Sequence, residues 1–128
     1  MSQHNIVKLR YCFNRVVRFI YGLNYRQHIS AYVISALRSD FQSFIDQRVI
    51  IQFYKFIKHG KPSYILQRFS FGRSSRTNIL ICPIHSTLFM NRSFVVRVSR
   101  IWNSVLPYEI RNFEKSIQHF KKILKDYL

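Results

Sequence analysis

The chain has 128 residues, enough for one domain or part of one, and its 48% hydrophobic and 16% aromatic residues exclude a composition typical of disorder. Its 21 Lys and Arg face 5 Asp and Glu, which gives a formal net charge of +16. A charge of this size opposes compaction unless a polyanion screens it, and binding to phosphates releases counterions from nucleic acid. We therefore expect RNA, DNA or both as the partner; a solvated basic surface without a ligand is the alternative interpretation.

The N-terminal half predicts helices. Residues 5–21 read as an amphipathic helix that ends at Gly22, because apolar side chains recur at three- and four-residue steps. Ser30 is expected to cap a short second helix, and Asp40 or Ser43 is expected to begin a longer third helix. The apolar stripe of the first helix comprises Ile6, Leu9, Phe13, Val16 and Ile20.

A small β element is predicted after the third helix, which Gly60 closes. Residues 68–76 read as a basic loop with interleaved aromatic side chains, and residues 77–82 are rich in Ile and Leu and predict a strand. Residues 94–98 alternate as a short strand does, but they also fit a helix that continues through Trp102. Both interpretations of this last stretch stay open.

The chain closes with a predicted helix that Ser116 is expected to cap. We expect a mostly α fold with a small β element (α+β): a helical N-terminal half, short strands or a hairpin near 68–98, and a C-terminal helix. Residues 1–128 are expected to form a single segment, with a helical part over 1–60 and a basic C-terminal part over 61–128.

Residue chemistry does not predict an enzyme. Nucleotidyl transfer needs carboxylates that converge on two metal ions, and the five acids include no Asp-Asp pair. The five His are scattered, and Cys12 and Cys82 lack metal-ligand spacing, so we expect no metal and no cofactor, and two small core cysteines. No signal peptide or transmembrane run is evident, and we expect an intracellular protein of the cytoplasm, the nucleus or both.

Two kinds of side chain form the predicted nucleic-acid-binding surface: cations for phosphates and aromatic rings for unpaired bases. The basic loop contributes Arg68, Phe69, Phe71, Arg73 and Arg76. The segment around the apolar Phe94 and Trp102 contributes Arg92, Arg97 and Arg100. Two helix faces, for which a solvated surface is the alternative, contribute Lys8, Arg15, Arg18, Lys121, Lys122 and Lys125. For the two rings of the loop a place in the core is an equal alternative, and Trp102 is expected to anchor the core.

Several short motifs follow one another along nearly the whole chain. They are Arg18-Phe19-Ile20-Tyr21-Gly22-Leu23, His28-Ile29-Ser30 with Tyr32, Lys61-Pro62-Ser63-Tyr64-Ile65, Arg73-Ser74-Ser75-Arg76 with Pro83, His85 and Thr87, Asn91-Arg92-Ser93-Phe94, Trp102-Asn103, Leu106-Pro107, Ile110-Arg111 and Phe120-Lys121. In this order they resemble the C-terminal, post-thumb segment of a non-LTR (LINE-type, jockey-like) retrotransposon reverse transcriptase. Val105 departs from the family pattern as an extra residue between Trp-Asn and Leu-Pro.

The resemblance implies an RNA-directed DNA polymerase whose fingers, palm and most of the thumb lie upstream of this chain, with 1–60 similar to the end of the thumb. Catalysis, with Mg, would belong to the upstream Ala-Asp-Asp motif, and this segment would hold template RNA or an RNA–DNA hybrid. It also implies that the apolar stripe of 5–21 packs on the missing thumb and that Met1 is an internal methionine of a truncated copy. The structural motif residues are Phe94, Trp102, Asn103 and Pro107.

Three other interpretations stay open. The chain is also compatible with a free-standing small basic RNA-binding structural protein, and with a decayed element copy that has no selected function. The amphipathic helix over 5–21 is compatible with binding to an anionic membrane surface, which a competition between RNA and liposomes would distinguish. Nothing in the sequence predicts an oligomeric state.

Overall fold

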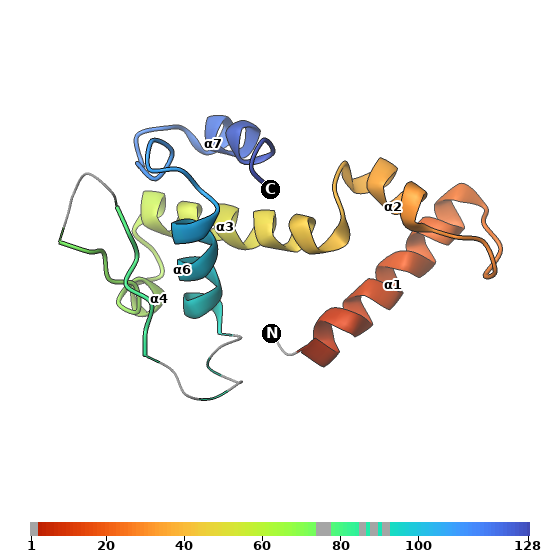
Figure 1. Ribbon diagram of the computed structural model, residues 1–128, viewed down its shortest axis with the longest axis horizontal. Coiled ribbons are helices and arrows are strands. Elements are labelled where there is room, and N and C mark those ends of the chain that lie inside the picture. Colours follow the sequence, from red (N-terminus) through yellow and green to blue (C-terminus); the bar gives the residue numbers. More distant parts are fainter. Residues whose placement is uncertain (1–2, 74–77, 85–86, 88–89, 91–92) are drawn as a thin grey trace. The chain divides into compact units, whose positions relative to one another are not determined.

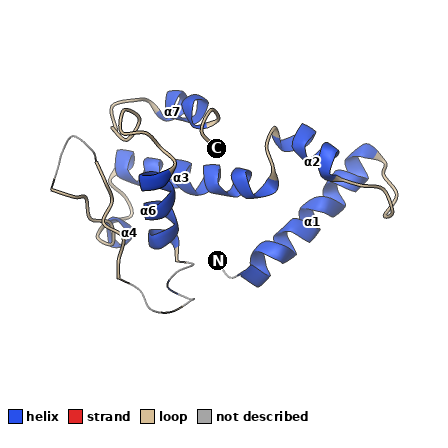
Figure 2. Cartoon of the chain, in the orientation of Figure 1, coloured by secondary structure: helices blue, strands red, loops and turns tan. Residues whose placement is uncertain are grey.

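The described part of the protein is mostly helical. A computed structural model (Figure 1) describes residues 3–73, 78–84, 87, 90 and 93–128. Within these residues helices alternate with loops (Figure 2), which confirms the expectation of a mostly α fold. The chain divides into two compact units, residues 1–45 and 46–128. The division falls inside the third helix, whereas the basic C-terminal part was expected to begin at residue 61.

The first unit consists of two helices and the beginning of a third: α1 (Gln3–Tyr21), α2 (Ser30–Leu37) and α3 (Phe41–His59). α1 ends where the sequence predicts, because Gly22 takes the left-handed φ of +62° that glycine adopts readily after a helix. The expectation that Ser30 caps α2 was wrong. Ile29 precedes the helix with helical backbone angles, no side-chain cap bond forms, and Ser30 is already the first helical residue.

The first unit has a thin core. Its described residues bury Val17, Val33 and Phe41, and the ring of Phe13 lies 5.7 Å from that of Phe41. The predicted apolar stripe of α1 is therefore used only in part: its members Leu9, Val16 and Ile20 are exposed. Val17 follows Val16 by one position, a rotation of about 100° around the helix. The face of α1 that is buried is thus turned by one residue from the predicted face.

Asp40 begins α3. Its two carboxylate oxygens accept a hydrogen bond from the backbone N–H of Ser43 at 3.0 Å and from the Ser43 hydroxyl at 2.7 Å. The pKa of Asp40 lies below its ordinary value, chiefly because the Ser43 N–H stabilises the charged form. Of the two residues expected to begin this helix, Asp40 is the N-cap and Ser43 is the third helical residue, which completes the cap.

Replacing Asp40 with Ala is expected to lower the free energy of unfolding by about 1 kcal/mol at neutral pH. Because the folded pKa is depressed below the reference value of 3.8, the contribution is present above that value and is lost as the pH falls through the folded pKa. Urea unfolding followed by circular dichroism at neutral pH and in strong acid measures both effects. Asp126→Ala removes an exposed acid elsewhere and serves as the control; equal losses in the two variants would contradict the prediction.

Among its described residues, the second unit contains the rest of α3 together with α4 (Ser63–Leu66), α6 (Phe94–Ser104) and α7 (Ile117–Leu124). α3 ends at His59, and Gly60 follows with a φ of +65°, as the sequence predicts.

Of the two interpretations for 94–98, the helix is correct. Ser93 caps α6 by accepting a hydrogen bond from the Val96 N–H, and this cap was not predicted. Ser116 caps α7 as predicted, by accepting a hydrogen bond from the backbone N–H of His119.

An aromatic core holds the second unit together. The indole of Trp102 is fully buried and stacks on Phe113 with ring centroids 5.3 Å apart, while Phe53 meets it edge-on at 5.2 Å. Tyr54 stacks on Phe120 at 3.9 Å, and its hydroxyl donates to a backbone carbonyl at 2.6 Å. Burial raises the pKa of Tyr54. These contacts join α3, α6 and α7, so residues far apart in the sequence share one core.

The expected β element is reduced to an isolated antiparallel bridge between Phe71 and Leu80. Two backbone hydrogen bonds of 2.7 Å flank it, from Gly72 N–H to Ile79 O and from Ile81 N–H to Ser70 O. Neither the strand expected over 77–82 nor one over 94–98 forms among the described residues. The N–H and C=O of Leu80 are both hydrogen-bonded to the side chain of Asn103, so they do not pair with a further strand.

Candidate nucleic-acid interface

In the basic loop the described cations are exposed, whereas one of the two aromatic rings is buried. Arg68 and Arg73 are exposed, as a phosphate-binding role requires. Phe69, in contrast, is only 9% exposed, and its ring packs 4.7 Å from that of Phe53, so we withdraw it from the predicted surface. Phe71 keeps 38% exposure while its ring meets that of Phe113 edge-on. The fifth predicted member of the loop, Arg76, lies outside the described residues.

Arg97 has a structural partner. Its Nη2 and Nε donate to the same carboxylate oxygen of Asp46, at 2.6 Å and 3.1 Å, and both side chains are half-buried. The pair connects α6 to α3 within the second unit. Because the guanidinium is already paired with a carboxylate, we withdraw Arg97 from the predicted surface. Arg100 is exposed one turn further along α6, and Arg92 lies outside the described residues.

The basic face of α1 is partly available. Lys8 and Arg15 are exposed beside a shallow hollow of about 540 Å³ on this helix. Arg18 lines the same hollow, but its Nη1 donates to the backbone oxygens of Asn24 and Gln27, at 2.5 Å and 2.9 Å, and so holds the loop after α1. This local role removes Arg18 from the surface as well. On α7, Lys122 and Lys125 are exposed and Lys121 is half-buried.

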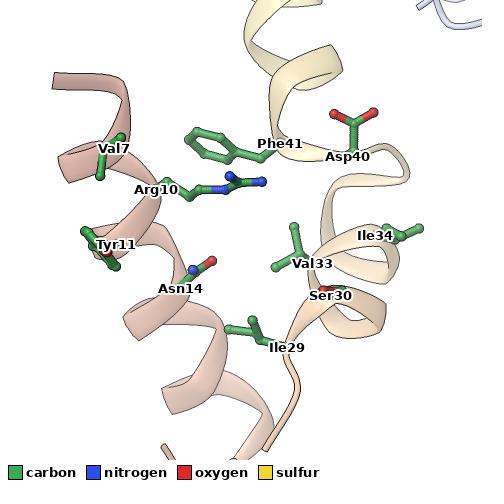
Figure 3. Close-up of a pocket in the computed structure, with 10 residues that line it drawn as sticks. All are labelled: Val7, Arg10, Tyr11, Asn14, Ile29, Ser30, Val33, Ile34, Asp40 and Phe41. Carbon is green, nitrogen blue, oxygen red and sulfur yellow. The ribbon is translucent and has the colours of Figure 1, made fainter. Parts of the chain in front are cut away.

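A larger hollow of about 560 Å³ lies in the first unit between α1, α2 and the start of α3 (Figure 3). Its lining is mostly apolar and includes Val33 and Phe41, two buried residues of the first unit. Arg10 reaches from α1 toward the ring of Phe41, with the guanidinium carbon 5.9 Å from the ring centroid. Asp40 also lines this hollow, and a carboxylate beside it opposes the binding of a phosphate. The hollow therefore adds little to a nucleic-acid interface.

A groove of about 430 Å³ in the second unit was not predicted. We call it the α4 groove; its lining includes Gln52, Phe56, Tyr64, Ile65, Arg68 and Phe94. The ring of Tyr64 is 69% exposed, and the rings of Phe56 and Phe94 meet edge-on at 6.1 Å. Sequence reasoning missed the groove because its residues come from three separate segments. The spacing of Tyr64 and Arg68, four positions apart, was the available signal.

The residues of the Trp-Asn, Leu-Pro and Ile-Arg motifs share one hydrogen-bond network. The Trp102 indole N–H donates to Asn78 O at 2.8 Å, and the Asn103 side chain bonds both backbone groups of Leu80. Arg111 donates from Nε to Leu106 O at 2.8 Å and from Nη2 to Asn103 O at 2.6 Å. The motif residues are therefore structural, and Pro107 lies half-buried directly after Leu106.

The cysteines differ from expectation. Cys12 and Cys82 are both exposed and are not core residues. In the described part of the chain, no three His, Cys, Asp or Glu side chains gather closely enough to hold a metal ion. No helix in that part combines the length and the apolar character needed to cross a bilayer.

Comparison with protein-family models, with curated proteins and with solved structures finds nothing that matches this chain.

Proposed function

We propose that this chain is a non-catalytic nucleic-acid-binding segment that holds RNA, DNA or an RNA–DNA hybrid through contacts with the phosphate backbone. The observation that carries the proposal is the set of exposed cations on both units. Among the residues predicted for the binding surface, these cations are Lys8, Arg15, Arg68, Arg73, Arg100, Lys122 and Lys125. Solvent-exposed Lys and Arg neutralise phosphates without reading the sequence of bases, which is the chemistry of sequence-independent binding.

The distribution of acids supports the same proposal. No Asp or Glu lies between Asp46 and Glu109, and the Asp46 carboxylate is already paired with Arg97. The exposed Arg68, Arg73 and Arg100 therefore belong to a span without acidic residues, and little within it opposes the approach of a polyanion. The formal net charge of +16 acts in the same direction over longer distances at low salt.

We propose further that the chain derives from the C-terminal region of a non-LTR retrotransposon reverse transcriptase. Two observations support this origin. The Trp-Asn, Leu-Pro and Ile-Arg motifs that carry the resemblance form one hydrogen-bond network, so they act as a unit. The apolar stripe of α1 also leaves Ile20 67% exposed, which suits packing against upstream polymerase domains.

Translating the genomic sequence upstream of the Met1 codon tests the origin. An in-frame Ala-Asp-Asp motif supports it. An unrelated sequence leaves two interpretations, a small basic RNA-binding protein or a decayed copy.

Binding itself is expected to depend steeply on salt. The logarithm of the association constant for a labelled single-stranded RNA should fall linearly with the logarithm of salt concentration, with a slope of about −0.7 per phosphate neutralised. Replacing both Lys122 and Lys125 with Gln should make that slope shallower by about 1 to 2, because two phosphate contacts are removed. Fluorescence anisotropy over a salt series measures the slope.

The control for this experiment is Gln118→Ala, which changes an exposed neutral side chain on the same helix, α7. It should bind as the unaltered chain does at every salt concentration. An affinity that is independent of salt, or a charge variant that behaves as the control does at all concentrations, would contradict binding through these phosphate contacts.

A further inference from the structure

We infer that the α4 groove is a subsite for an unpaired nucleobase, so that the chain prefers single-stranded over double-stranded nucleic acid. This inference rests on the proposed function and names its ligand class. Base stacking needs aromatic rings that solvent reaches beside a cation for the adjoining phosphate. Tyr64 supplies an exposed ring, and Arg68, also exposed, lines the same groove.

The lining of the groove suits a base. Three aromatic rings, those of Phe56, Tyr64 and Phe94, contribute to it, and every nucleobase has a π face that stacks on such rings. Gln52 adds a side-chain amide, which carries a donor and an acceptor for the polar edge of a base. A purely apolar protein side chain or lipid chain in the groove would make no hydrogen bond with the Gln52 amide or the Arg68 guanidinium.

Charge around the groove favours a polyanionic strand. None of the described residues that line it is acidic. On α3, Lys55 lies three positions after Gln52, so helical geometry places it on the same side of the helix, about 5 Å along the axis. Arg68 adds a further cation from the segment after α4. A strand whose base enters the groove thus finds cations for its phosphates at Arg68 and, along α3, at Lys55.

The groove distinguishes single strands from duplexes for a geometric reason. In a duplex the faces of the bases are stacked on one another and are not accessible to side chains. Phosphate contacts at Arg68 remain possible with either ligand, whereas stacking on Tyr64 requires an unpaired base. The two contributions can therefore be separated by substitution.

The experiment compares the full chain with Tyr64→Ala and, as the control, Tyr108→Ala, which removes another exposed tyrosine ring of the second unit outside the groove. The probes are a labelled oligothymidylate, a duplex of equal length and an abasic strand with the same phosphates. Tyr64→Ala should weaken binding of oligothymidylate about 5- to 150-fold, and leave the duplex and the abasic strand unchanged. Tyr64→Trp should keep the preference, because it restores a stacking ring.

Three results would overturn the inference. The first is oligothymidylate binding that is equally strong in Tyr64→Ala and the control, as expected if the groove receives an apolar side chain of a protein. The second is an equal loss on all three probes, which would make Tyr64 part of a general phosphate surface. The third is an unaltered chain that binds none of the probes. If that chain also fails to bind the single-stranded RNA of the salt series, the proposed function is rejected as well, so the two failures are distinguishable.

Discussion

Replacing Trp102 with Ala is expected to lower the free energy of unfolding of the second unit by about 3–5 kcal/mol. The substitution removes a fully buried ring that stacks on Phe113 and contacts Phe53 edge-on, and it leaves a cavity among α3, α6 and α7. It also leaves Asn78 O without its indole donor. Because small domains are stable by only about 5–15 kcal/mol, this loss is a large fraction of the total stability.

Urea unfolding followed by far-ultraviolet circular dichroism measures this loss, since the variant no longer contains the single tryptophan of the chain and tryptophan fluorescence is lost with it. The stability of Trp102→Phe should lie between that of the unaltered chain and that of Trp102→Ala. The phenylalanine keeps an aromatic ring in the core but leaves the Asn78 carbonyl without its indole donor. A Trp102→Ala variant within about 0.5 kcal/mol of the unaltered chain would show that this ring does not anchor the core.

Replacing Asn103 with Ala should cost about 2–4 kcal/mol, although Asn103 is polar and only half-buried. Its Oδ1 accepts from Leu80 N–H at 2.9 Å, and its Nδ2 donates to Leu80 O at 2.7 Å. Leu80 is 1% exposed, so both of its backbone groups would lose their partner in a site that water reaches poorly. Hydrogen exchange of the Leu80 amide should also become faster, because that amide is the donor of one of the two bonds.

Ser104→Ala is the matched control, because Ser104 is the next residue of α6 and its exposed hydroxyl bonds within its own helix. It should change stability by no more than about 0.5 kcal/mol. Asn103→Asp keeps the acceptor for Leu80 N–H but sets a carboxylate oxygen against Leu80 O, and should cost nearly as much as the Ala variant. Equal stabilities of Asn103→Ala and Ser104→Ala would mean that the segment around Leu80 is held by other contacts.

Periodicity and punctuation in the sequence predicted most of the helices. Gly22 and Gly60 end α1 and α3 because glycine adopts positive φ without a steric penalty. Asp40 and Ser116 begin helices because their side-chain oxygens accept backbone N–H bonds that a helix start leaves unpaired. These are local effects, which depend on residues within one turn and can be read without the fold.

The same local reasoning left 94–98 undecided and predicted a strand over 77–82. Val95, Val96 and Val98 have side chains that favour strands, but burial of Val98 and Trp102 on one face, with a cap at Ser93, makes this stretch helical. The choice depends on which partner covers those side chains. That information lies in α3 and α7, far away in the sequence.

The mostly helical character, the strongly basic charge and the helix ends at Gly22, Asp40, Gly60 and Ser116 were predictable, because each depends on composition or on neighbours along the chain. Which of the candidate side chains face solvent became known only from the three-dimensional contacts. It placed Phe69 in the core, paired Arg97 with Asp46 and brought Tyr64, Arg68 and Phe94 to one groove. The physical reason is that burial and ion pairing depend on contacts between distant segments, which the spacing of residues in a sequence does not specify.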